Sequence, residues 1–230
     1  MDSAVAIQRR LFSVDEFHRM GPLMILAECA ELIHGVVLDK TGGWSPHCWT
    51  YDQYMELGRA GILDEDERTE LIDGEIVRMA PVGHRHIYVV DQLTRRLTQW
   101  MGETALVRVQ SPVRFNSVEA PCPDVTVLRL TDDHYRSRQA GPWDALLVIE
   151  VADTSVLHDR EVKGPMYARA AIPEYWLADV NRPVVVVHLA PVAGEYTDVR
   201  EYGPGEAWTS PALSRVVSVD EALGLPLPER

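Results

Sequence analysis

The sequence predicts an α/β fold in which helices flank a mixed sheet. Apolar residues between His84 and Met101 recur at helical spacing, which makes this segment the clearest helix of the chain. Three β-rich runs follow at 105–115, 124–130 and 145–151, and the last two are almost wholly apolar, as in strands that are covered on both faces. The order helix, strands, helix, strand is typical of an α/β sandwich.

The elements after the third β-rich run complete this pattern. They are a helix at about 159–170, a strand at 174–178, a hairpin of 184–190 with 196–202, and a short closing helix near 220–223. Pro165 lies inside the expected helix, and because proline lacks a backbone N–H it should kink this helix or delay its start.

The N-terminal third contains a duplicated element. Residues 12–17 match 49–54 at an offset of 37, and residues 31–37 match 70–76 at an offset of 39. Two copies are too few for a solenoid, which usually needs three or more. The duplication therefore predicts a repeated helix-turn-strand element.

Short helices and a hairpin are expected within these copies. Ser13 lies three residues before Glu16, and Thr50 lies three before Gln53, which is the capping-box arrangement at the start of a helix. Asp73-Gly74 is a strong hairpin signal between two short strands.

The repeat defines the expected domain organisation. Residues 1–45 are interpreted as an N-terminal extension that duplicates the element at 49–77. Residues 46–215 form the main domain, and 216–230 are a C-terminal tail.

Length and composition are those of a globular protein. The chain has 230 residues, of which 46% are hydrophobic and 25% charged, and its formal net charge is −13. About 150 residues per domain is usual, so one domain with an appendage is expected. The negative charge argues against a general coat of nucleic acid, but it leaves open an enzyme that meets DNA on one face and carries its own metal ions.

Several classes of protein are excluded or disfavoured. The apolar segment 22–33 is interrupted by Glu28 and Glu31 and is far shorter than the ~20 residues of a membrane span. The N-terminus has no signal-peptide pattern, and three well-separated cysteines form neither a disulfide framework nor a metal site, so a cytoplasmic protein is expected. The motifs GxSxG, HExxH and a Gly-rich phosphate loop are all missing from the sequence.

Two acids are notable for their positions. Asp124 opens one apolar run directly after Pro123, and Glu150 closes the next. A carboxylate that is buried without a partner costs several kcal/mol, so a metal or a cation is expected beside each. Two such acids on adjacent strands would make half of a divalent-cation site. The alternative is that both lie at sheet edges in solvent, and the spacing does not separate the two interpretations.

Lys163, on the next helix, is a candidate cation for this site. It lies four residues before Tyr167 and so shares its helical face. Its neighbours Asp159, Arg160 and Glu161 are interpreted as surface charges. Lys163 could equally be a solvated lysine, although nearly all the cations of this chain are arginines.

Glu70 and His86 each have two interpretations. Glu70 either supplies a third carboxylate or flanks the Asp73-Gly74 turn. His86 shares a helical face with Val90 and Leu93, where a histidine is more often a core residue than a base. Its position near a helix N-terminus also allows a supporting or phosphate-contacting role.

Positive charge is concentrated in one segment. Residues 84–116 carry a local charge of +3, whereas residues 1–75 carry −9. The asymmetry suits a nucleic-acid face, with Arg85 and Arg108 as expected contacts, although solvated arginines are the commoner explanation.

A resemblance to a known family joins these observations. The matching segments, in order over about 49–190, are Glu70–Ile76, Met79–Pro81 with Arg85-His86, Val109–Val113, Pro123–Val125, Ile149–Asp153, Asp159–Lys163, and Tyr167–Arg169 with Ile172–Leu177. This set resembles the Uma family of restriction-endonuclease-like proteins, a branch of the PD-(D/E)XK nuclease superfamily.

The resemblance implies a restriction-endonuclease-like α/β fold and a metal-dependent endonuclease that hydrolyses DNA phosphodiester bonds. Asp124 and Glu150 would hold Mg²⁺ or Mn²⁺, and Lys163 would stabilise negative charge or activate the attacking water. Glu70 would be a third catalytic acid, and Gln110 and His86 would be accessory residues.

One departure and two alternatives accompany this hypothesis. The superfamily lysine stands two residues after the second acid, where this chain has Ala152, so Lys163 would have to reach back from the following helix. The alternatives are a catalytically inactive module that binds DNA or protein, and a structural dimerisation protein with solvated acids. Nuclease relatives commonly pair to cut two strands, so a homodimer is expected.

Overall fold

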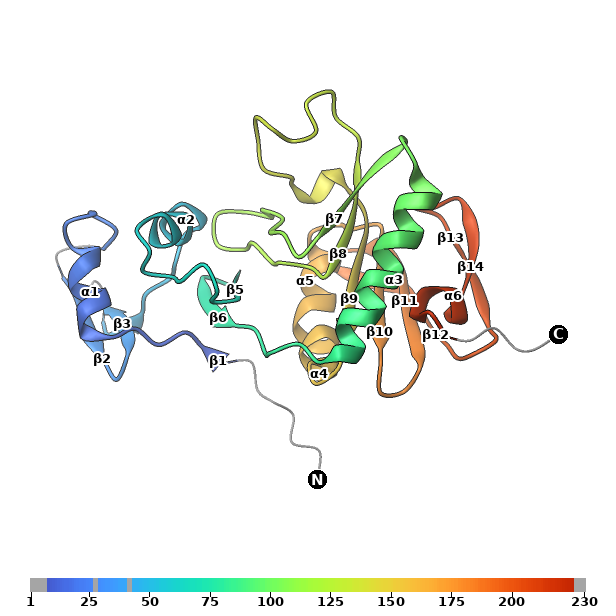
Figure 1. Cartoon of the computed structure of the whole chain (residues 1–230). Coiled ribbons are helices and arrows are strands. Elements are labelled where there is room, and N and C mark those ends of the chain that lie inside the picture. Colours follow the sequence, from blue (N-terminus) through green and yellow to red (C-terminus); the bar gives the residue numbers. More distant parts are fainter. Residues whose placement is uncertain (1–7, 27–28, 41–42, 226–230) are drawn as a thin grey trace. The chain divides into compact units, whose positions relative to one another are not determined.

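The computed structural model describes residues 8–26, 29–40 and 43–225. These form two compact units, which are described separately (Figure 1). Unit 1 comprises residues 80–113 and 122–225, and unit 2 comprises 8–79 and 114–121. The boundary predicted at residue 46 lies inside unit 2, because both copies of the repeat contribute to one hydrophobic core.

Unit 1 is built on a six-stranded mixed sheet. Its strands, in spatial order, are β12 (Glu195–Tyr202), β11 (Val184–Val192), β10 (Glu174–Asp179), β9 (Ala145–Ala152), β8 (Val125–Arg129) and β7 (Ala105–Val109). β9 and β10 pair in parallel, and every other neighbouring pair is antiparallel. The predicted mixed α/β sheet is confirmed.

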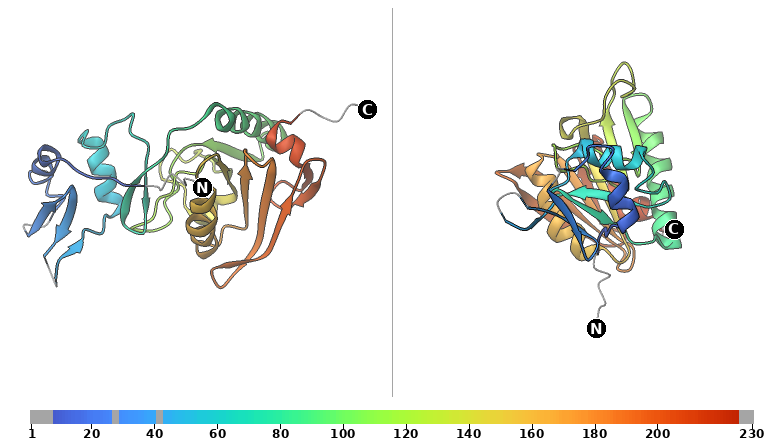
Figure 2. Two further views of the ribbon diagram at one scale, coloured as in Figure 1. Left: turned by 90° about the horizontal axis from the view of Figure 1, so that it is seen from below. Right: turned by 90° about the vertical axis from the view of Figure 1, so that its left-hand side faces the viewer.

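Helices cover both faces of this sheet, as the left view of Figure 2 shows. The long helix α3 (His84–Met101) lies on one face, and α5 (Gly164–Arg169) lies on the other. α6 (Val219–Leu223) and the hairpin of β13 (Ala207–Ser210) with β14 (Arg215–Ser218) also contribute to the core on the α3 side. Residues 217–223 of the predicted C-terminal tail therefore contribute to the packed core of unit 1.

The core of unit 1 follows the alternation of the central strands. Leu147, Ile149 and Val151 of β9 point to the α3 side and pack with Leu93 and Leu97, and all five are buried. Each such side chain contributes roughly 1.5–3 kcal/mol by leaving water. Because successive strand residues face opposite ways, Glu150 points to the α5 side.

Two predicted elements differ from the structure. The first β-rich run ends at Val109, because Gln110 takes a left-handed conformation with φ +44° that no regular strand accommodates. The helix expected at 159–170 is three pieces, namely α4 (Val156–His158), a π-helical turn (Asp159–Lys163) and α5. Pro165 lies in the first turn of α5, where proline is tolerated. The helical segment begins at Val156, so its start is not delayed.

Unit 2 contains the two copies of the repeat. The helices α1 (Val14–Met20) and α2 (Tyr51–Arg59) both begin with the predicted capping box. The strands are β1 (Gln8–Arg9), β2 (Ala30–Ile33), β3 (Val36–Asp39), β4 (Ser45–Pro46), β5 (Thr69–Ile72) and β6 (Glu75–Arg78). Asp73-Gly74 turns between β5 and β6 with positive φ at both residues, which confirms the predicted hairpin.

The pKa of Glu16 makes unit 2 sensitive to acid. A hydrogen bond from Arg10 lowers this pKa from 4.5 to about 2, against the opposing effect of burial. A carboxyl whose pKa is depressed on folding stabilises the fold above its unfolded pKa, and this contribution is lost as the pH falls through the folded value. We expect unit 2 to lose stability between pH 4.5 and 2, with a shallower loss in Glu16→Gln, as thermal unfolding at several pH values will show. An equally steep loss in the variant would contradict this expectation.

Candidate active site

Asp124 and Glu150 come together because β8 and β9 pair in register. Val125 lies opposite Ile149, and Asp124 comes one residue earlier, where its Oδ2 accepts a hydrogen bond of 2.9 Å from the backbone N–H of Val151. Both carboxylates are buried, with Asp124 4% and Glu150 2% exposed. β8 and β9 are interior strands of the sheet, so the interpretation of two solvated edge acids is wrong.

Glu150 is neutralised from the α5 side. Lys163 Nζ lies 3.0 Å from Glu150 Oε1, and the hydroxyl of Tyr167 donates to the same oxygen. Lys163 is only 2% exposed, so it is not a solvated lysine. The side chain reaches the strand from the π-helical turn just before α5. Burial and the positive charge of Lys163 together lower the pKa of the adjacent His158 to about 4.

Asp159 also belongs to this cluster, and its interpretation as a surface charge is wrong. Its side chain is buried, its Oδ1 lies 4.0 Å from Lys163 Nζ, and Ser155 Oγ donates to its other oxygen. Asp159, Lys163 and Tyr167 follow one another at intervals of four residues, the spacing that places side chains on one helical face. This spacing from Lys163 is the sequence signal that could have identified Asp159 and Tyr167 as residues of the site.

Asp124 is held from the other side by His86, in the first turn of α3. His86 Nε2 lies 3.0 Å from Asp124 Oδ1, and His86 Nδ1 lies 2.7 Å from the carbonyl oxygen of Val151. Both ring nitrogens thus lie within 3.0 Å of an oxygen acceptor. His86 therefore links the N-terminus of α3 to the first acid and to the residue after the second.

The environment of Asp124 keeps it ionised. Burial acts to raise the pKa of Asp124, but the hydrogen bond and charge of His86, the Val151 N–H and the charge of Lys163 hold that pKa below its usual value. Gln110 Nε2 lies 3.3 Å from Asp124 Oδ1, and the left-handed backbone of Gln110 helps to place it there. The carboxylate is available as an anionic ligand at neutral pH.

Three further predicted site residues lie on α3, β7 and β5. Arg85 is exposed in the first turn of α3. Arg108, on β7, is half-buried, and its guanidinium lies 5.2 Å from the centre of the Tyr135 ring. Glu70 belongs to unit 2, where it is buried on β5 opposite Val77.

The donor set fits a small divalent cation. Asp124 and Glu150 supply carboxylate oxygens, the ligands that Mg²⁺ and Mn²⁺ prefer. Among the described residues, no group of three or more His, Cys, Asp and Glu side chains forms a complete cage. Mg²⁺ does not need one, because it is commonly bound by one or two carboxylates and completes its shell with water and substrate phosphate.

The mixed sheet, with two acids on its central strands and a buried lysine beside them, defines a protein of the restriction-endonuclease-like fold class. Residues 51–222, about three quarters of the chain, match the sequence model of the Uma2 family, described as "Putative restriction endonuclease". The chain belongs to the Uma2 family, and the resemblance noted in the sequence is confirmed.

A solved structure supports the fold. This chain is similar to the crystal structure of a "putative nuclease belonging to DUF820" from Anabaena variabilis ATCC 29413, with a TM-score of 0.60 and 14% identity. The match covers 76% of this chain and 98% of the other. No curated protein matches this chain. Within the described part of the chain, none of the helices combines the length and apolarity needed to cross a membrane.

Proposed function

We propose that this protein is a metal-dependent endonuclease that hydrolyses DNA phosphodiester bonds at the Asp124–Glu150–Lys163 cluster. One observation carries the proposal: Asp124 and Glu150 are buried carboxylates on paired segments of the sheet, and the buried ammonium group of Lys163 lies 3.0 Å from Glu150 and adds its charge to the environment of Asp124. Such a concentration of buried charge is costly to a fold and is characteristic of catalytic sites. Membership of a family described as restriction endonucleases gives the same reaction class.

Each residue has a role in this proposal. Asp124 and Glu150 would hold Mg²⁺ or Mn²⁺, which when bound stabilises charge on the phosphate and lowers the pKa of its water. Lys163 stabilises the negative charge that develops on the phosphate oxygens. Tyr167 holds Glu150, Asp159 lies beside the ammonium of Lys163, and His86 and Gln110 orient Asp124.

The lysine of this chain lies at another position than the superfamily lysine, but it still brings a positive charge to Glu150. The residue two places after Glu150 is Ala152, which is buried in β9 and carries no functional group. Lys163 brings an ammonium to within 3.0 Å of Glu150 from the following helical segment. A helix-borne lysine therefore supplies the cation that a strand lysine supplies in the superfamily pattern.

The remaining site residues complete the proposal. Arg85 is exposed beside the N-terminus of α3, and Arg108 lies on β7, so both would contact the DNA backbone by charge. The assignment of Glu70 as a third acid stays a prediction.

The proposal is tested by cleavage and by metal binding together. Purified protein should cut supercoiled plasmid or linear duplex in the presence of Mg²⁺ or Mn²⁺ and not in EDTA. Asp124→Asn should reduce cleavage at least ~100-fold and abolish Mn²⁺ binding in calorimetry, because a neutral amide is a poor ligand. Asp132→Asn, at an exposed position after β8, is the matched control and should behave like the wild type.

One observation favours a second function, a catalytically inactive module that binds DNA or protein. Lys163 pairs with Glu150 and His86 with Asp124, so the charges of both acids are balanced by the protein's own side chains. Mn²⁺ titration separates the two functions. A chain that binds neither Mn²⁺ nor Mg²⁺ and cuts no form of DNA is the inactive module.

A further inference from the structure

The two copies of the repeat in unit 2 are equivalent in three dimensions. The N–H of Phe12 donates to the carbonyl of Gly35 at 2.8 Å, and the N–H of Trp49 donates to Gly74 at 2.8 Å. These pairs are related by the sequence offsets of 37 and 39. In each copy the residue before the helix cap is thus bonded to the glycine of the following hairpin turn.

The copies exchange their leading strands. β1, which precedes the first copy, pairs with β6 of the second, placing Gln8 opposite Arg78. β4, which precedes the second copy, pairs with β3 of the first, placing Ser45 opposite Asp39. Gln8 is the repeat equivalent of Ser45, and Asp39 is the repeat equivalent of Arg78, so the two strand pairings are equivalent and have the same register. This reciprocity is what a two-fold axis between two subunits produces.

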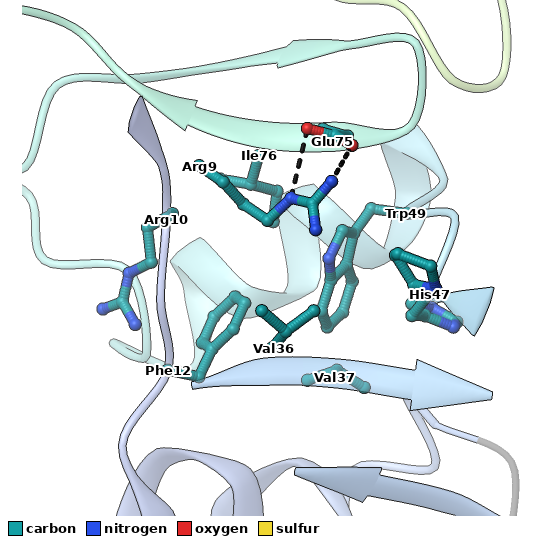
Figure 3. Close-up of a pocket in the computed structure, with 10 residues that line it drawn as sticks. Arg9, Arg10, Phe12, Val36, Val37, His47, Trp49, Glu75 and Ile76 are labelled. Carbon is teal, nitrogen blue, oxygen red and sulfur yellow. Dashed lines mark hydrogen bonds and ion pairs between the residues drawn. The ribbon is translucent and has the colours of Figure 1, made fainter. Parts of the chain in front are cut away.

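Side chains repeat the same symmetry at the junction of the copies. A cavity of about 20 Å³ lies there, and the ten residues that line it are five pairs of repeat equivalents (Figure 3). The pairs are Arg9 with Pro46, Arg10 with His47, Phe12 with Trp49, Val36 with Glu75, and Val37 with Ile76. The rings of Phe12 and Trp49 are 5.2 Å apart, so equivalent residues meet across the axis.

From this arrangement we infer that residues 8–40 act as a built-in second subunit, so that the self-pairing surface of unit 2 is closed within one chain. The partner that this surface fits is a second copy of the same element, and the first copy occupies that place. A covalently linked partner is present at an effective concentration in the millimolar range, which a second chain rarely reaches. The family match begins at residue 51, so the first copy lies outside it.

The internal pair has ion pairs that a pair of two second copies would lack. Arg9 pairs with Glu75, and Arg10 bonds Glu67 as well as Glu16. Another chain's second copy would bring Pro46 and His47 to those places and leave Glu75 without its arginine.

The other half of the exchange is equally selective. His47 Nδ1 lies 2.8 Å from Asp39 Oδ2 across the β3–β4 pair. The repeat equivalent of Asp39 is Arg78, so two second copies would set a histidine against an arginine. The second copy is thus complementary to the first copy and not to itself.

A disulfide across β1 and β6 tests the inference in the full chain. Gln8→Cys with Arg78→Cys joins two exposed positions that lie opposite each other in the ladder, within reach of a disulfide. Cys48→Ser removes an exposed thiol. After oxidation at micromolar concentration we expect complete cross-linking within one chain, seen as a monomer of about 26 kDa on a non-reducing gel.

The outcomes are decisive in both directions. Cross-linked dimers would overturn the inference, because β1 would then pair with another chain, and so would two thiols that stay free after oxidation. A second variant, Arg9→Cys with Val77→Cys, repeats the test at the neighbouring pair in case the first misfolds. The measurement is whether the disulfide joins two cysteines of one chain or of two chains. A dimer formed through another surface therefore does not affect the conclusion.

Discussion

Replacement of Lys163 by methionine is expected to abolish cleavage and to destabilise unit 1. The substitution keeps an unbranched chain but removes the ammonium that lies 3.0 Å from Glu150. A buried carboxylate without its cation costs about 3–5 kcal/mol. The loss of a preorganised positive group at a developing charge lowers the rate by ~100-fold or more. Plasmid cleavage measures the rate, and hydrogen exchange of β8–β10 measures the stability.

A double variant separates catalysis from stability. Glu150→Gln combined with Lys163→Met removes both charges, so most of the lost stability should return while cleavage stays absent. Arg160→Met, three residues earlier and exposed, is the matched control and should leave both quantities unchanged. A Lys163→Met protein that is less stable but cuts at the wild-type rate would show that the buried pair is structural only.

The sheet and the two acids could be predicted from sequence because their signals are local. The runs at 124–130 and 145–151 are mostly apolar, as is typical of strands that are covered on both faces. Asp124 and Glu150 stand at the ends of these runs, so antiparallel pairing of the strands brings them together. Lys163 could also be predicted, because the helical segment that carries it follows directly after the strand of Glu150.

The partners of these acids could not be predicted in the same way. His86 is bonded to Val151, 65 residues away, and nothing in its own helix specifies that contact. Asp159 resembles the exposed charges beside it, and only its spacing of four residues from Lys163 sets it apart in the sequence. The exchange of β1 and β4 rests on strands of two residues each, too short for any periodicity. Such features depend on tertiary packing.

Arg10→Met is expected to unfold unit 2 selectively. Arg10 is 5% exposed, and its guanidinium donates to Glu16 of the first copy, to Glu67 of the second and to the carbonyl of Ile62. Methionine would fill similar space but leave both carboxylates without this partner, at a cost of about 3–5 kcal/mol. Hydrogen exchange should therefore accelerate in β2–β6 and remain unchanged in β8–β10.

Arg9→Met is the matched comparison, one residue away on the same strand. Arg9 also makes an ion pair, with Glu75, but 36% of its side chain is exposed. Exposed ion pairs contribute only about 0–1 kcal/mol, so this variant should exchange almost as the wild type does. Equal effects of the two substitutions would mean that strand β1, and not the buried guanidinium, holds the copies together. A large difference would identify Arg10 as the residue that links them.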